Sequence, residues 1–274
     1  MLQTIHPRRI FQALDEIDQA SPSYSLSRPK ALRRVFWTLA CVSVCLLLLH
    51  YGKNSSILRE ALVVVAHVTG SDSANWWRSW QSSGVLSLIG YLWWSSMHLF
   101  TFVLLPWLFI RLVLKEKLID HGWRWNDTHK HWLEYLLLAT PILLFVYLVS
   151  LGDDFVNHYP FYQHAGRSWA DLIAWQVLYI GQFIFLEFFF RGFMLNALRP
   201  AMGANAVWVM CVPYMMIHLP KLPLEATGAI LFGLFLGILA LLSRSIWGGV
   251  MVHVSIALSM DLAALYRKSE IPLK

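Results

Sequence analysis

Long apolar stretches are the strongest constraint on what this chain can fold into. An apolar helix of about 20 residues is long enough to cross the hydrocarbon core of a bilayer. We expect seven spans, at about residues 35–51, 85–114, 132–151, 170–198, 204–218, 224–242 and 246–266. A further apolar segment, 57–68, is too short to span and fits the membrane interface. The sequence therefore predicts an all-α, polytopic transmembrane helical bundle with seven spans, or eight if 57–68 re-enters the membrane.

The composition supports the same fold class. Only 14% of the 274 residues are charged and 57% are hydrophobic, whereas a soluble domain carries roughly 25% charged residues. The three cysteines, Cys41, Cys45 and Cys211, all lie inside apolar stretches and form no Cys-x-x-Cys pair. They predict small apolar packing groups, and neither a disulfide framework nor a cysteine metal site.

The basic residues indicate orientation and not a nucleic-acid partner. The formal net charge is +6, and its lysines and arginines cluster at the ends of apolar stretches, as topology signals do. Their distribution places the N-terminus in the cytoplasm of a multi-pass protein of the cell (inner) membrane, with an uncleaved first span. We divide the chain into a cytoplasmic segment (1–34), N-terminal transmembrane helices (35–169), a C-terminal helical core (170–266) and a tail (267–274).

A carboxylate and a guanidinium lie deep inside the fourth apolar stretch. Glu187 and Arg191 are four residues apart, so they share one face of a helix and can pair there. An ionisable group at bilayer depth costs on the order of 3 kcal/mol, and such groups are functional more often than idle. The pair therefore predicts a functional site, with a structural ion pair as the alternative.

Other polar side chains recur along the following spans, namely His218, Glu225, His253 and Asp261. Peptide hydrolysis needs a base that activates water, a group that protonates the leaving amine, and donors for the oxyanion. A glutamate and two histidines on neighbouring helices could provide these functions. Neither a Gly-x-Ser-x-Gly motif nor another clear nucleophile is present, so the pattern favours water as the attacking group.

The Glu187/Arg191 pair and His218 each lie in a short sequence motif. The first reads Leu186-Glu187-Phe-Phe-Phe-Arg191 and the second Tyr214-Met-Met-Ile-His218. The order resembles the CPBP family (CAAX proteases and bacteriocin-processing enzymes, also called Abi) of intramembrane proteases, whose motifs read E-E-x-x-x-R, F-x-x-x-H and H-x-x-x-N. The eukaryotic Ras-converting CAAX endoprotease is a member. The resemblance covers residues 170–265 and implies an intramembrane endopeptidase with Glu187, Arg191 and His218 in its site.

The chain departs from that pattern at two positions. Leu186 stands where the family has its first glutamate, which is thought to activate water with the second-motif histidine. The third motif begins at His253 and ends in Ala257, without a polar residue. The resemblance therefore leaves Glu187 and Glu225 as candidate bases, with Glu187 favoured because it belongs to the motif.

One further residue role and two other functions of the chain remain open. Asp261, two helical turns after His253, could replace the missing third-motif polar group. Without the first glutamate, the chain could instead be a non-catalytic relative that acts as a membrane chaperone, immunity factor or assembly partner. A small transporter is a third alternative, although we find no internal repeat of the kind that transporters often carry.

Metal chemistry is the nearest rival within the hydrolases. His218, His253 and a carboxylate could form a zinc site with three protein ligands, but the chain has no His-Glu-x-x-His motif. We therefore expect no cofactor and no metal. The expected partners are the lipid bilayer and a membrane-associated protein or peptide substrate.

The histidines of the connecting loops are expected to be exposed to solvent; they are His121, His129, His131, His158 and His164.

Overall fold

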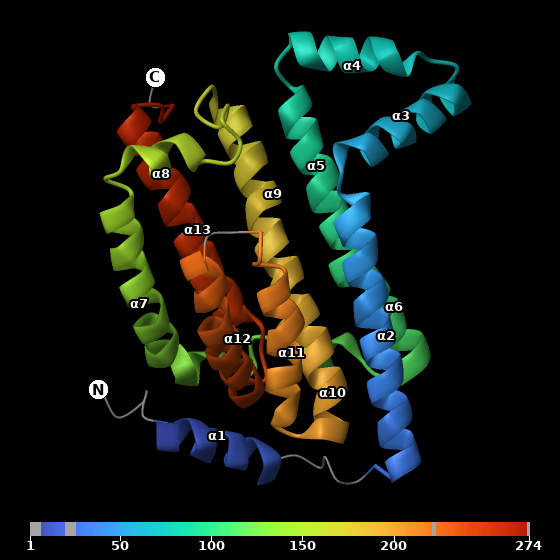
Figure 1. Cartoon of the computed structure of the whole chain (residues 1–274), viewed down its shortest axis with the longest axis vertical. Coiled ribbons are helices and arrows are strands. Elements are labelled where there is room, and N and C mark those ends of the chain that lie inside the picture. The colour runs from blue at the N-terminus through green and yellow to red at the C-terminus, as the bar shows by residue number, and fades with distance from the viewer. Residues whose placement is uncertain (1–6, 20–25, 221–222, 273–274) are drawn as a thin grey trace. The chain divides into compact units, whose positions relative to one another are not determined.

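All the secondary structure of the described residues is helical. The computed structural model describes residues 7–19, 26–220 and 223–272 and is drawn in Figure 1. The α-helices are α1 (Pro7–Gln19), α2 (Arg28–Gly52), α3 (Ser55–Thr69), α4 (Ser73–Ser82), α5 (Leu86–Leu99), α6 (Leu105–Phe109), α7 (Trp132–Val149), α8 (Asp153–His158), α9 (Trp169–Glu187), α10 (Leu195–Met202), α11 (Asn205–Met216), α12 (Pro223–Ser243) and α13 (Trp247–Lys268). Three π-helical segments, η2 (Phe100–Leu104), η3 (Ile110–Leu114) and η6 (Phe188–Met194), and two 3₁₀ segments, η4 (Leu118–His121) and η5 (Asn126–His131), connect them.

Six helical stretches of the described residues are long and apolar enough to cross a membrane. They are Arg28–Gly52, Leu86–Leu114, Leu118–Val149, Trp169–Met202, Ala226–Ser243 and Trp247–Lys268. The chain is a multi-pass membrane protein, and the predicted all-α fold class is confirmed. The predicted count of seven or eight spans is not confirmed.

The difference in span count lies in the stretch expected at 204–218. Its helix, α11, has only 12 residues, so it is about 18 Å long, against a hydrocarbon core of about 30 Å. Pro220 and Pro223 follow closely, and a proline disfavours helical geometry in the residue before it. The apolar stretch therefore ends in a turn over residues 217–220, well short of a full crossing.

The chain forms two compact units. The first unit is Met1–Val44, Phe102–Tyr135 and Leu186–Met251, and the second is Cys45–Thr101, Leu136–Phe185 and Val252–Lys274. These units interleave along the sequence, so they do not test the four-part division expected above, which stays a prediction.

In the first unit, α11 and α12 pack side by side (Figure 1). The contact is close because Gly233 and Gly237 of α12 both face α11. A Cβ on Gly233 would lie 2.9 Å from Cys211 Sγ, and one on Gly237 would lie 3.0 Å from both Met210 and Val207. The Gly-xxx-Gly spacing thus marks a helix contact, as it commonly does between membrane helices.

The loop between the second and third spans is fixed by an ion-paired cluster in the first unit. Both Arg34 terminal nitrogens bind the Glu116 carboxylate, at 2.6 and 3.0 Å, and Arg34 Nε donates to the Ala197 carbonyl at 2.6 Å. His121 Nε2 lies 2.9 Å from the same carboxylate. His121 is buried, with 1% of its surface exposed, so its expected exposure to solvent is wrong; the Glu116 carboxylate provides the polar partner that burial requires.

In the second unit, an aromatic cluster forms the core. Tyr162, Trp175 and Tyr179 are buried together with Ala257 and Leu265, and Trp175 stacks on Tyr179 at 4.8 Å between ring centroids. Arg167 and Tyr162 both bind the Asp171 carboxylate at the start of α9. Aromatic packing therefore joins α9 and α13 within this unit.

We predict that enlarging Gly237 separates α11 from α12. Gly237→Leu should lower the free energy of unfolding by about 1–3 kcal/mol, the usual effect of overpacking a tight contact, as measured by denaturation in detergent. Gly228→Leu is the matched control on the same helix, because a Cβ there meets nothing within 4 Å. Equal effects of the two changes would contradict the tight packing of α11 on α12.

The Glu116 cluster predicts a pH dependence of stability. Burial alone would raise the pKa of Glu116, but hydrogen bonds from His121 and Arg34 outweigh it and lower the pKa from 4.5 to about 2. A carboxylate with a depressed folded-state pKa stabilises the fold above its unfolded pKa and loses that effect as the pH falls through the folded value. The stability difference between the parent and Glu116→Gln should therefore be full above pH 4.5 and shrink towards pH 2. A difference that stays constant over this window, in melting curves at stepped pH, would refute the assignment.

Candidate active site

The site is built on the junction of α9 and η6. Glu187 is the last residue of α9 and Arg191 lies within η6. Arg191 Nη1 is 3.0 Å from Glu187 Oε1, and both side chains are fully buried. The predicted ion pair is therefore present. π-helical segments are rare and often occur at functional sites. The position of the ion pair at the start of η6 therefore favours a functional site.

Aromatic packing explains how the motif keeps this geometry. Phe188, Phe189, Phe190 and Phe193 are all fully buried. Their rings contact different elements: Phe188 meets Trp123, Phe189 stacks on Phe102, Phe190 meets Tyr214 and Phe193 meets Phe109. Phenylalanines pointing in several directions hold η6 in place from all sides, which orients the two charged groups between them.

Two consecutive glycines in the first turn of α13 make room beside the pair. A Cβ on Gly249 would overlap the Glu187 carboxylate, and a Cβ on Gly248 would overlap the ring and hydroxyl of Tyr135. The Tyr135 hydroxyl also lies 3.2 Å from Ser243 Oγ. The carboxylate thus lies against the start of a helix, where the positive end of the helix dipole favours a negative charge.

Tyr214 links the ion pair to His218. The Arg191 guanidinium lies over the Tyr214 ring, 4.0 Å from its centroid, in a cation–π contact. The Tyr214 ring packs in turn against the His218 ring, with centroids 4.8 Å apart. Glu187, Arg191, Tyr214 and His218 therefore form one continuous series of contacts within the first unit.

The hydrogen bond of His218 fixes the useful end of its ring. His218 Nδ1 lies 2.8 Å from the Tyr214 carbonyl oxygen, which can only accept, so Nδ1 carries a proton. In the neutral ring, Nε2 then carries the lone pair. This tautomer suits a side chain that takes up and returns a proton, because its orientation is held by the other nitrogen.

His218 also sits where the regular backbone stops. It lies two residues after the end of α11, within the turn 217–220. Irregular backbone at membrane depth is tolerated only where protein covers it or where it lines a water-filled cavity. The position is therefore compatible with access of water to the imidazole.

His253 belongs to the second unit. It lies on α13, and its ring stacks on Phe183 of α9, with centroids 5.7 Å apart and planes at 12°. Its expected part in peptide hydrolysis, together with Glu187 and His218, stays a prediction.

Asp261 is held in the core of the second unit. It is fully buried, and its Oδ2 accepts hydrogen bonds from Trp175 Nε1 at 2.6 Å and Gln176 Nε2 at 2.9 Å. These contacts join α13 to α9, the two helices that carry His253 and Phe183. The geometry gives Asp261 a positioning role between helices, while its predicted part in the reaction stays a prediction.

Glu225 lies in the first turn of α12, but its side chain is outside the described residues. Its predicted role as the rival base stays a prediction. Among the described residues, no group of three or more His, Cys, Asp or Glu side chains could hold a metal ion.

Sequence reasoning missed Tyr135 and Gly249. Tyr135 is 52 positions before Glu187, so no local spacing connects them, and only the fold brings both against the start of α13. The doublet Gly248-Gly249 at a helix start was the available signal, since consecutive glycines suggest a close approach of another group to the backbone.

We predict that the buried pair is strongly coupled. Arg191→Met and Glu187→Gln should each lower the free energy of unfolding by about 3–5 kcal/mol, because each leaves one uncompensated polar partner in a dry site. The double variant should be clearly more stable than the sum of the two losses predicts. Additive losses, measured in a double-mutant cycle by denaturation in detergent, would mean that the two groups are not energetically coupled.

The comparisons with known proteins point to the same part of the chain. No curated protein and no solved structure shows a significant match. Residues 168–259, about a third of the chain, match the model of a family described as Type II CAAX prenyl endopeptidase Rce1-like. This range contains Glu187, Arg191, His218 and His253, and the match is consistent with the CAAX-protease (CPBP) family that the motifs resemble.

Proposed function

We propose that this chain is an intramembrane endopeptidase of the cell inner membrane, which hydrolyses a peptide bond of a membrane-associated protein or peptide. The observation that carries the proposal is the continuous contact from Glu187 through Arg191 and Tyr214 to His218. These four residues lie within the region that matches the endopeptidase family. A buried carboxylate can activate water as a base, and an oriented imidazole can carry a proton to the leaving amine.

In the proposed reaction, Glu187 takes a proton from water, whose oxygen attacks the peptide carbonyl. The Arg191 guanidinium, 3.0 Å from this carboxylate, holds it in place. His218 Nε2 then receives this proton from Glu187, which restores the carboxylate, and delivers it to the leaving amine as the carbon–nitrogen bond breaks. His253 is proposed to donate a hydrogen bond to the oxyanion.

Leu186 stands where the family has its first glutamate, so another carboxylate must act as the base in the proposed reaction. Leu186 is buried and offers no polar group. Glu187 is proposed to act in place of the missing glutamate, and Glu225 is its rival. The proposal is tested by comparing the two carboxylates directly.

We predict that Glu187→Gln lowers turnover by at least about 100-fold, the usual contribution of a general base. The assay is purified protein in detergent with a library of membrane-anchored peptides, both prenylated and unprenylated. Glu60→Gln is the control, because Glu60 is an exposed carboxylate on α3, and its turnover should match the parent. Melting curves establish that each variant remains folded.

Two other outcomes would contradict the assignment of Glu187 as the base. If Glu225→Gln is inactive while Glu187→Gln is merely unstable, Glu225 is the base. If the folded parent cleaves no peptide, while both variants match the parent in a working cellular assay, the non-catalytic roles as chaperone, immunity or assembly factor replace the proposal.

Chelation separates this chemistry from a zinc enzyme. A glutamate–histidine site should keep its turnover after exhaustive dialysis against a chelator, because no step requires a Lewis acid. Loss of turnover on chelation with recovery on added zinc, together with one zinc per chain by elemental analysis, would establish the metal alternative.

A further inference from the structure

The helical hairpin of α3 and α4 lies outside the proposed catalytic region. It connects the end of the first span at Gly52 to the start of the second at Leu86, so its two ends lie at the same membrane face. With 15 and 10 residues, α3 and α4 are about 22 and 15 Å long, and neither can cross a hydrocarbon core of about 30 Å. Neither helix therefore spans the membrane, and the apolar α3 of this hairpin suits the membrane interface.

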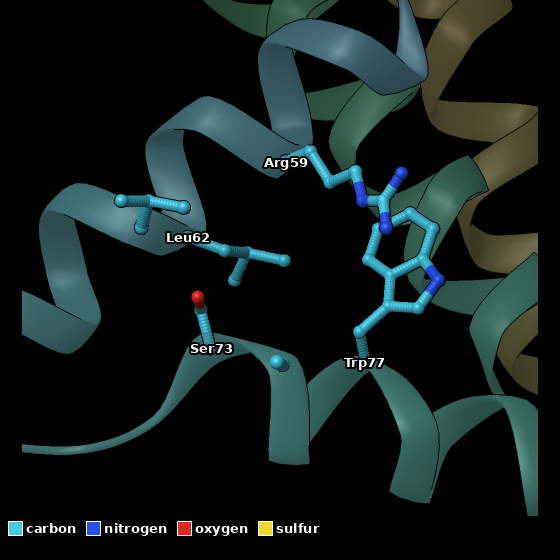
Figure 2. A pocket seen from close by; sticks show the side chains of 6 residues that line it. Arg59, Leu62, Ser73 and Trp77 are labelled. Carbon is cyan, nitrogen blue, oxygen red and sulfur yellow. The ribbon is translucent and has the colours of Figure 1, made fainter.

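A pocket of about 180 Å³ lies between these two helices (Figure 2). Its lining residues are Arg59, Leu62, Val63, Ser73, Ala74 and Trp77. Figure 2 shows the Arg59 side chain reaching from α3 to the Trp77 ring of α4, and the Ser73 hydroxyl pointing towards Leu62. The guanidinium carbon is 4.8 Å from the centroid of the Trp77 ring.

The pocket combines one positive charge with an apolar wall. Arg59 is the one charged residue among the six that line it, so the pocket favours an anion. A guanidinium stacked on an aromatic face is held by the ring while its N–H groups still point outward, in a geometry that matches phosphate oxygens. The Ser73 hydroxyl is a second possible donor.

The surface beside the pocket suits acyl chains. Val63, Val64 and Val68 of α3 are 57%, 63% and 79% exposed. Tryptophan is enriched at the boundary between headgroups and hydrocarbon, and Trp76 stacks on Trp80 on the neighbouring helix. A molecule that fits all these features has a negatively charged head and an apolar body.

We propose that the α3–α4 pocket binds the phosphate headgroup of an anionic phospholipid, with Arg59 as its principal contact and the acyl chains along the valines of α3. Charge selects the class of lipid. The phosphate of a zwitterionic lipid such as phosphatidylcholine carries a cationic group nearby, which Arg59 repels, whereas the headgroup of phosphatidylglycerol has no such group. This binding is independent of the proposed peptidase activity.

The test compares retention of phosphatidylglycerol and phosphatidylcholine with the same acyl chains, by native mass spectrometry of the full chain in detergent. The parent should retain phosphatidylglycerol preferentially. Arg59→Gln should reduce its affinity about tenfold, which corresponds to the loss of one charge-assisted hydrogen bond. Arg78→Gln is the matched control, because Arg78 is exposed on α4 and does not line the pocket.

A second variant and a competitor complete the experiment. Trp77→Ala removes the surface that orients the guanidinium, so it should also weaken phosphatidylglycerol retention, and melting curves should show both pocket variants folded. Inorganic phosphate should compete only weakly, because it lacks acyl chains. Equal retention of the two lipids, or equal losses in Arg59→Gln and Arg78→Gln, would overturn the proposal, and tight binding of phosphate alone would identify a free-anion site in its place.

Discussion

The burial of one carboxylate against one guanidinium governs the arrangement of the first unit. A charge deep in a dry interior is costly unless an opposite charge pairs with it. Glu187 and Arg191 meet this requirement through their 3.0 Å contact, the Tyr214 ring over which the guanidinium lies, and the space left by Gly249. The phenylalanines of η6 then fix the backbone that carries the pair. Tyr214, Gly249 and the phenylalanines of η6 each hold the ion pair in place or leave room for it.

A second constraint is the interruption of α11. Prolines after its last turn end the helix before it has crossed the bilayer, and this places His218 in irregular backbone. α12 packs closely along α11 through Gly233 and Gly237, so this contact holds the short helix in place. The same contact brings Tyr214 near Gly233, so the packing of α12 also supports the ring between Arg191 and His218.

The sequence predicts much of this arrangement, and the failures have physical causes. Apolar length identifies the long spans, and spacing of four places Glu187 and Arg191 on one face. Hydropathy overestimates the stretch that contains α11, because apolar composition continues past the residue at which proline geometry ends the helix. His121 was expected in solvent since it lies in a loop, but its partners Glu116 and Arg34 come from separate segments. Tyr135 could not be assigned because its proximity to the site depends on the tertiary fold alone.

The length of α11 has a consequence for what the proposed peptidase can cleave. At about 1.5 Å per residue, the 12 residues of α11 make a helix of roughly 18 Å, which in the proposed function carries the imidazole of His218 into the bilayer. A polypeptide at that depth normally conceals its carbonyl groups in helical hydrogen bonds, since lipid offers no other partner. Under the proposed function, the scissile bond would come from a segment that unwinds readily. Selectivity would then depend on the local fragility of the substrate helix, read at a fixed depth, as well as on side chains next to the cleaved bond.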